Sequence, residues 1–354
     1  MLRLVLQSGP NVKQQIKIIA AGSVLALTLF GVATAGSMED GVAAAERGDY
    51  AAAMRLWRPL AEQGEARAQL LVALLYENGQ GAPQDYAQAV LWFRKAADQG
   101  NASAQASLGF MFVNGQGVRQ DYSQGALWYR KAADQGDADA QNNLGTMYSQ
   151  GQGVARDDTQ AAMWFRKAAD QGNALAQANL GDMFHQGQGV AQDDAQAALW
   201  FRKAADQGFA SAQYNLGFMY ANGQGVPQDY AQAAMWCRKA ADQGNADGQA
   251  YLGLMYENGW GVPQDYAQTF VWYRKAADQG SVVARHNVGL MYETGEGVPR
   301  DYTLAYLWYN LAAASAPDAA TRDAAVKDRD SIAGKMTSSQ LAEAQRIARE
   351  WVPK

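Results

Sequence analysis

A tryptophan recurs at intervals of 36 residues along most of this chain. The spacing is constant over seven copies, at Trp92, Trp128, Trp164, Trp200, Trp236, Trp272 and Trp308. An aspartate (Asp85 in the first copy) and a glycine (Gly79) recur with the same interval. A fixed period of this length is typical of an array in which each repeat is one supersecondary unit. The period therefore favours an array over the two or three globular domains that 354 residues would ordinarily suggest.

One repeat, residues 101–136, is predicted to form two helices joined by a turn. Asn101 is a suitable N-cap for a first helix, and Gly115 can end it because glycine tolerates the left-handed conformation after a helix. Asp121 is expected to cap the second helix, with Gln124 completing a capping box. Apolar residues follow helical spacing in both segments, at Ala104, Leu108, Met111 and Phe112 and at Ala126, Trp128, Tyr129, Ala132 and Ala133.

Such a helix pair buries its apolar face only when it stacks on its neighbours, so the sequence predicts an all-α solenoid of helix–turn–helix repeats with a 36-residue period. The tryptophan is expected to anchor one helix on another. Gly109 and its equivalents lie inside the first helix, where glycine costs about 1 kcal/mol relative to alanine. We therefore expect another backbone to approach there too closely for a Cβ.

The regular repeats are predicted to span residues 65–316, with irregular segments on both sides. Residues 39–64 resemble a shortened repeat, because Trp57 lies 35 residues before Trp92. Residues 317–354 are expected to form C-terminal capping helices over the last repeat. Thr337 and Gln340 are spaced as a capping box for the second of these helices.

Residues 1–35 have the composition of a secretory signal peptide. Basic residues come first, an apolar stretch covers residues 18–32, and the small-residue site Ala33-Thr34-Ala35 follows. The alternative is an uncleaved anchor, since residues 18–38 carry no charge and are long enough to span a bilayer. The expected location is therefore periplasmic or secreted, with inner-membrane anchoring as the alternative and membrane contact only if the segment is retained.

Composition excludes several classes of site. The chain has one cysteine and two histidines, so disulfide pairing within the chain and cysteine-based or three-histidine metal sites are excluded. Its formal charge of −5 argues against nucleic-acid binding through a basic surface. No metal, cofactor or catalytic constellation is expected. Cys237 occupies a position held elsewhere by Phe or Tyr, so it is interpreted as an inert packed residue rather than a reactive thiol.

The repeat pattern A-x-x-x-L-G-x-M-Y-x-x-G-x-G-V-x-x-D-Y-x-x-A-x-x-W-x-x-K-A-A-x-x-G resembles the Sel-1-like repeat family, a relative of the tetratricopeptide repeats. The resemblance covers roughly residues 39–316. It implies a right-handed α/α superhelix whose first helices line a concave groove. It also implies a non-enzymatic adaptor for a protein or peptide, in envelope maintenance or host interaction. The alternative is an envelope enzyme, or a modulator of an enzyme, that acts on peptidoglycan or a β-lactam. The oligomeric state stays open.

By the geometry of that family, the positions on the first helix that vary between repeats face the groove. Tyr214 and Phe218 would form an apolar patch beside polar Asp182, suited to an extended peptide or a partner helix. The alternative is that the two aromatics only pack against a neighbouring repeat. Asparagines recur before the Leu-Gly pair and would bind a partner's backbone or, alternatively, hydrogen-bond to the adjacent repeat. The candidate partner-binding residues are Phe110, Asn143, Asn179, Asp182, Tyr214, Asn215, Phe218, His286 and Asn287.

Two further features yield expectations. Arg94 and Asp98 recur as a pair four residues apart, which predicts a solvated, salt-bridged face on the second helices. Trp260 lies outside the period, in a turn where other repeats have Gln or Glu, and is expected to be exposed.

Overall fold

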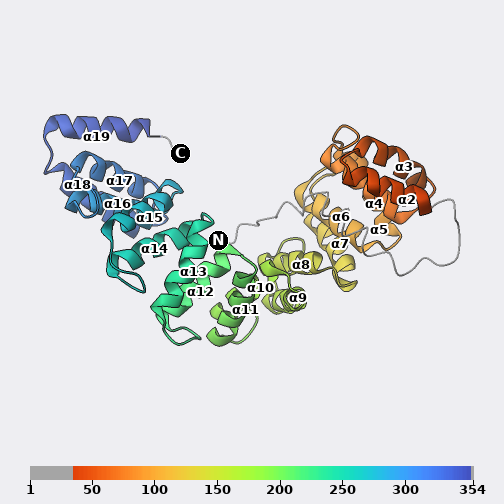
Figure 1. The fold of residues 1–354 in the computed structure, drawn as a ribbon, viewed down its shortest axis with the longest axis horizontal. Helices are drawn as coiled ribbons and strands as arrows, with labels where there is room; N and C mark the ends of the chain where they lie inside the picture. Colours follow the sequence, from red (N-terminus) through yellow and green to blue (C-terminus); the bar gives the residue numbers. More distant parts are fainter. Residues whose placement is uncertain (1–34, 352–354) are drawn as a thin grey trace. The chain divides into compact units, whose positions relative to one another are not determined.

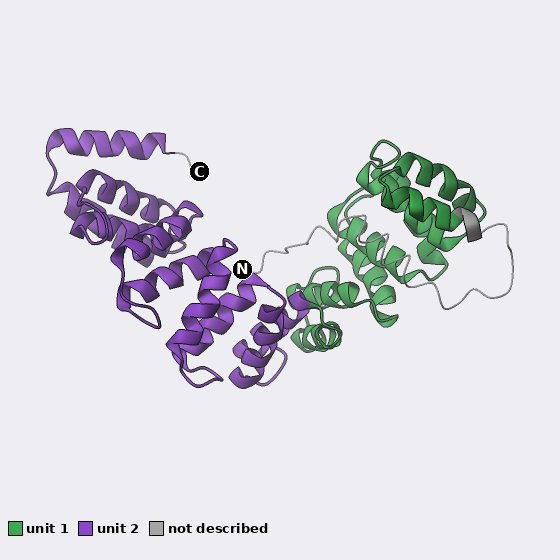
Figure 2. Cartoon of the chain, viewed as in Figure 1, with its two compact units in different colours: residues 1–173 green, residues 174–354 purple. Residues whose placement is uncertain are grey.

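The computed structural model describes residues 35–351, and this part of the chain is built of helices without a strand. Figure 1 shows the helices in chain order, and Figure 2 shows the two compact units into which they divide, residues 1–173 and 174–354. The proposed signal segment, residues 1–35, lies outside the described residues except for Ala35. None of the helices described is long and apolar enough to cross a membrane.

In the first unit the described helices come in consecutive pairs that pack together. They are α2 (Ala35–Glu46), α3 (Tyr50–Glu62), α4 (Ala66–Asn78), α5 (Tyr86–Asp98), α6 (Ala102–Asn114), α7 (Tyr122–Asp134), α8 (Ala138–Gln150) and α9 (Asp158–Asp170).

The second unit repeats this arrangement and adds two helices at its end. Its helices are α10 (Ala174–Gln186), α11 (Asp194–Asp206), α12 (Ala210–Asn222), α13 (Tyr230–Asp242), α14 (Ala246–Asn258), α15 (Tyr266–Asp278), α16 (Val282–Thr294), α17 (Tyr302–Ala314), α18 (Ala319–Ala333) and α19 (Ser338–Glu350). The predicted all-α solenoid of helix–turn–helix repeats, with a period of about 36 residues, is confirmed.

Local sequence signals place the helix ends where they were predicted. The Asn101 side chain accepts a hydrogen bond from the Ala104 amide, and Gly115 ends α6 with φ 67°. The Asp121 carboxylate accepts from the Gln124 amide at 3.0 Å, which caps α7, but the Gln124 side chain does not return the bond of the predicted capping box. The complete reciprocal capping box forms at Thr337 and starts α19.

The glycine inside the first helices from α6 to α16 packs mainly against a side chain of the partner helix, so the expectation of a close backbone is confirmed only in part. A Cβ on Gly109 would lie 2.8 Å from Cδ1 of the Tyr129 ring on α7, whereas one on Gly217 would also lie 3.1 Å from a backbone carbonyl of α13. A closer backbone approach occurs at Gly117, where a Cβ would collide with the carbonyl of Tyr86 in the preceding repeat. The contact at Gly109 sets how deeply α7 packs on α6, and the one at Gly117 joins successive repeats.

The repeated tryptophans are buried, with 1% to 6% of each exposed, as expected for anchors. Trp164 belongs to one apolar cluster with Tyr129 of α7 and Leu144 of α8. Trp164 thus packs with the preceding second helix as well as with its own partner helix. Lys131 adds a cation–π contact, with its Nζ 3.8 Å from the centroid of Trp128 on the same helix.

The arginines of the second helices mostly bind the next repeat, so the predicted salt-bridged face is wrong for several of them. The expected ion pair forms between Arg274 and Asp278, at 3.1 Å. The Arg130 guanidinium instead donates to the Tyr148 hydroxyl and lies 5.0 Å from the centroid of Trp164. The same pair of contacts recurs at Arg202 with Tyr220 and Trp236, and at Arg238 with Tyr256 and Trp272.

A buried ladder of glutamines also joins the repeats, and nothing in the sequence analysis anticipated it. Gln105 Nε2 donates to the Ala97 carbonyl at 3.1 Å, and Gln105 Oε1 accepts from Gln135 Nε2 at 2.7 Å. Gln213 bonds in the same way to Ala205 and Gln243. Each rung adds a further bond to a carbonyl at the C-terminal end of a second helix, a group that also accepts from an amide of the following turn.

Candidate functional site

The candidate partner-binding face lies on the first helices of the second unit. On α12, Gln213, Leu216 and Gly217 are buried, whereas Tyr214 and Phe218 are half-buried. The two aromatics lie four residues apart and therefore share one side of the helix. That side is the part of α12 that remains open to contact.

Three aromatic side chains form a continuous cluster across two repeats. The Tyr214 and Phe218 ring centroids are 6.3 Å apart, and Tyr251 of α14 lies 6.2 Å from Tyr214 and 5.5 Å from Phe218. The rings thus pack on the neighbouring repeat, as the second alternative predicted, and still keep part of their surface exposed, so partner binding there stays a prediction. We call Tyr214, Phe218 and Tyr251 the aromatic cluster.

Tyr251 was missed by the sequence analysis. It occupies the position that holds Asn143, Asn179, Asn215 and Asn287 in other repeats. That departure from the repeated asparagine was the available signal. It marked Tyr251 as unusual but could not place its ring against Tyr214 and Phe218.

A polar pair lies at the edge of the aromatic cluster. Asn215 Nδ2 donates to Asp182 Oδ1 on α10, at 3.3 Å. Burial raises the pKa of the Asp182 carboxyl to about 6, although the charge of His185 acts in the opposite direction. His185 itself is bonded to Asp194, with 2.7 Å between its Nδ1 and the carboxylate oxygen.

Other predicted asparagines lie beside tyrosines of the preceding helix. Asn143 lies against the Tyr129 hydroxyl, and Asn287 lies against the Tyr273 hydroxyl. Tyr273 also donates to Glu257, at 2.6 Å. Asn179 is half-buried on α10. Asn287 thus agrees with the local interpretation, in which asparagine links adjacent helices, whereas the Tyr129 hydroxyl beside Asn143 has no hydrogen-bond partner among the described residues.

Phe110 and His286 are placed apart from the aromatic cluster. Phe110 of α6 is half-buried and packs against an apolar cluster of the first unit that contains Val113 and Leu144. His286 Nε2 lies 2.8 Å from Asp328 Oδ2 on α18, and its ring is 5.2 Å from Tyr309. The ring of His286 is therefore already paired with the capping helix α18 of the same chain.

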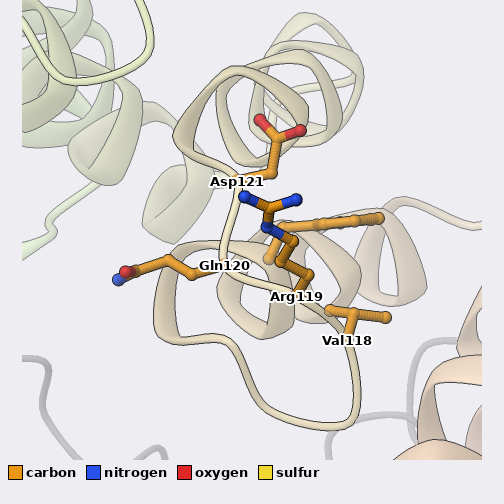
Figure 3. A pocket seen from close by; sticks show the side chains of 5 residues that line it. Val118, Arg119, Gln120 and Asp121 are labelled. Atoms are coloured by element: carbon orange, nitrogen blue, oxygen red, sulfur yellow. The ribbon is translucent and has the colours of Figure 1, made fainter.

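A surface hollow in the first unit belongs to the repeat connection. It is lined by Phe112 and by Val118 to Asp121, the labelled side chains in Figure 3. Gln120 Nε2 donates to the Val113 carbonyl at 2.8 Å, and Asp121 caps α7. These side chains hold the turn between α6 and α7, so the hollow has a structural explanation.

The structure agrees with the expectation for Cys237 but not with the one for Trp260. Cys237 is fully buried against Gly217, and burial raises the pKa of its thiol to about 12, which supports the inert interpretation. Trp260 is half-buried and stacked on Tyr230, with 5.5 Å between ring centroids. The expected exposure of Trp260 was therefore wrong. Among residues 35–351, no group of three or more His, Cys, Asp or Glu side chains is arranged to hold a metal.

Comparison with known proteins gives the family. The Sel1 repeat matches residues 33–65, 66–101, 102–137, 138–173, 174–209, 210–245, 246–281 and 282–316. No curated protein matches the chain.

Two solved structures agree with this match. A protective antigen present in uropathogenic Escherichia coli strains, described as displaying an SLR fold, is 30% identical with a TM-score of 0.56. That similarity covers 96% of this chain and 94% of the antigen. A Sel1 repeat protein from Oxalobacter formigenes is 31% identical with a TM-score of 0.62, over 68% of this chain and 96% of that protein. The chain belongs to the Sel1 repeat family.

Proposed function

We propose that this protein is a non-enzymatic adaptor that binds a protein or peptide on the α10, α12 and α14 face. Solenoids of Sel1 and tetratricopeptide type are typically protein-interaction scaffolds. The observation that carries the proposal is the aromatic cluster, whose three rings stay half-buried on a face edged by Asp182 and Asn215. Aromatic side chains at such a site offer large contact area at low entropic cost.

The residues that recur in every repeat pack within the fold. The residues of this face vary between repeats and can therefore determine which partner binds. Tryptophans, glycines and ladder glutamines recur at fixed positions and have partners within the fold. The positions of Tyr214 and Phe218 carry Ala and Leu in the next repeat, at Ala250 and Leu254. Binding would thus be set by side chains that vary on a constant scaffold.

The proposed location is the bacterial envelope, in a periplasmic or secreted form, with inner-membrane anchoring as the alternative. The composition of residues 1–35 supports export. The similar E. coli protein is described as a protective antigen, which supports a role where a host meets the bacterium. Sequencing the N-terminus of protein recovered from periplasm, medium and membranes would distinguish the forms.

A peptide-display experiment tests the adaptor proposal. The immobilised protein selects from a library of random 12-residue peptides, and the selected peptides are then measured against a Tyr214→Ala/Phe218→Ala variant. We expect binding to fall by at least ~10-fold, which corresponds to about 1.4 kcal/mol. A matched control, Leu199→Ala/Met235→Ala, removes exposed apolar side chains from the second helices instead.

Thermal melts verify that both variants remain folded. Equal loss of binding in the control variant, or unchanged binding in the aromatic-cluster variant, would show that the peptide does not bind at the aromatic cluster. Failure to select any peptide would contradict a peptide-binding groove.

A further inference from the structure

The first helices around the aromatic cluster carry acidic residues and neither lysine nor arginine. Helices α10, α12 and α14 contain Asp182, Asp247 and Glu257 and lack a basic residue other than His185. By contrast, each of the second helices α11, α13 and α15 carries an Arg-Lys pair, as at Arg202 and Lys203. The side chains of the helices that bear the aromatic cluster therefore carry a net negative charge.

Two carboxylates lie beside the aromatic cluster, on different helices. Asp182 is held by Asn215, which directly follows Tyr214 and lies one turn before Phe218 on α12. Burial raises the pKa of the Tyr214 hydroxyl to about 12, and the charge of Asp247, in the first turn of α14, raises this pKa further. Aromatic rings and carboxylates thus share one surface.

Asp182 is a half-buried carboxylate whose bonded partner is a neutral amide. His185, whose charge acts on Asp182, is itself paired with Asp194. A carboxylate in this position has lost part of its hydration without gaining a full ionic partner, which agrees with the raised pKa of Asp182. A cation brought by a ligand would supply the missing partner.

The aromatic cluster favours the same kind of ligand. The faces of tyrosine and phenylalanine rings attract a cation within about 6 Å of the ring centroid, worth ~0.5–1 kcal/mol at an exposed site and more when water is excluded. Arginine suits such a surface best, because its planar group stacks on rings and forms paired hydrogen bonds with a carboxylate. Lysine carries the same charge but lacks a planar group that could stack on a ring.

We infer that the aromatic cluster and Asp182 together bind an arginine or lysine side chain of an extended partner peptide. This inference rests on the adaptor proposal and deepens it, because it names the partner as a basic peptide. The Asp182 carboxylate pairs with the cationic group, the rings of Tyr214 and Phe218 cover its apolar stem, and Asp247 adds to the local negative field.

Peptides from the display experiment provide the test. Each selected peptide is synthesised again with citrulline in place of every arginine and norleucine in place of every lysine, and its Kd is measured by calorimetry. We expect basic residues to be enriched and the neutral replacement to raise Kd by about 10-fold, equivalent to one ion pair with a cation–π contact.

Protein variants assign the effect to Asp182. In Asp182→Asn the amide oxygen can still accept from Asn215, and the preference for the charged peptide should fall below about 2-fold. Asp247→Asn should lower it partly. Asp206→Asn, which removes an exposed carboxylate from the end of α11, is the control and should leave the preference intact.

The outcomes separate the two proposals. If peptides bind through Tyr214 and Phe218 but tolerate citrulline and norleucine, the cation site is wrong and the adaptor proposal stands. If the charge preference survives Asp182→Asn in a folded protein, Asp182 is not the recognition group. If no peptide depends on the aromatic cluster, both proposals fail.

Discussion

Gly217 lies so close to Cys237 that a Cβ on the glycine would stand 2.6 Å from the cysteine Sγ. In other repeats the same glycine position faces a ring, as Gly253 faces Tyr273. The first helix can therefore pack closely on its partner because the glycine has no Cβ at the point of contact. Contact between these two positions therefore determines how closely the first and second helices of a repeat pack.

We expect Gly217→Ala to destabilise the protein by ~1–3 kcal/mol, because overpacking outweighs the higher helix propensity of alanine. In a Cys237→Ala background the Sγ is absent, so the same change should cost at least ~1 kcal/mol less. Urea unfolding of the four proteins in this cycle measures the coupling. Additive effects would show that Gly217 and Cys237 do not restrict one another.

Features decided within one helix or turn could be predicted from the sequence. Asn101, Gly115 and Asp121 act through their own backbone and nearest amides, so their roles followed from residue type and spacing. Periodicity then fixed the pairing of helices, because each apolar face has to be buried against a neighbour.

Contacts between repeats could not be predicted in the same way. Arg130 is spaced for an ion pair with Asp134, yet its guanidinium reaches Tyr148 and Trp164, because stacking places those groups within range. The aromatic cluster has the same origin. Tyr251 joins Tyr214 and Phe218 only through the offset between α12 and α14, which sequence spacing does not give.

The glutamine ladder should contribute to stability through satisfied buried groups. Gln213→Met keeps the length of the side chain but removes its hydrogen bonds to the Ala205 carbonyl and the Gln243 amide, although the carbonyl still accepts from the Gly208 amide. We expect a loss of ~1–3 kcal/mol, the contribution of two hydrogen bonds. Gln186→Met, at an exposed helix end, is the control and should change the unfolding free energy by less than about 0.5 kcal/mol. Similar losses of unfolding free energy in both variants would show that the glutamine ladder does not stabilise the protein.

Glu77 should make the protein less stable as pH rises. Burial raises the pKa of this carboxyl from 4.5 to about 7 in the folded state. The folded protein therefore holds the proton more tightly than the unfolded chain, so the benefit is complete below pH 4.5 and is lost as pH rises through about 7. Relative to Glu77→Gln, the wild-type unfolding free energy should fall by up to about 3 kcal/mol between pH 4.5 and 8. Parallel pH profiles of the two proteins would contradict this prediction.

Phe93 explains why Glu77 lacks a donor that its equivalents have. Glu257 and Glu293 accept from the hydroxyls of Tyr273 and Tyr309, at 2.6 and 2.8 Å, whereas the ring at the corresponding position beside Glu77 is Phe93. We expect Phe93→Tyr to stabilise the protein at pH 8 by ~1.5–3 kcal/mol, as a hydrogen bond to a charged group would. Chemical denaturation measures the gain. Phe165→Tyr, whose corresponding position is Ser149, is the control and should give no such gain.

The C-terminal helix α19 should keep the last repeat from self-associating. In inner repeats a lysine covers the tryptophan, as Lys275 Nζ lies 3.9 Å from the Trp272 centroid. The last repeat has Leu311 at that position, and Trp351 packs on Trp308 with 6.2 Å between ring centroids. Leu307 is 4% exposed there, whereas its equivalents from Leu91 to Val271 are 37% to 48% exposed.

Deleting residues 338–354 should therefore expose a contiguous apolar surface around Leu307 and Leu311, and such surfaces promote association. Light scattering after size exclusion should show larger species for the truncated protein than for the full chain. Leu311→Lys in the truncated protein restores the residue of the inner repeats, so its ammonium group can cover Trp308. We expect this variant to return to the oligomeric state of the full chain. Persistent large species would mean that α19 covers a surface other than the one formed by Leu307, Trp308 and Leu311.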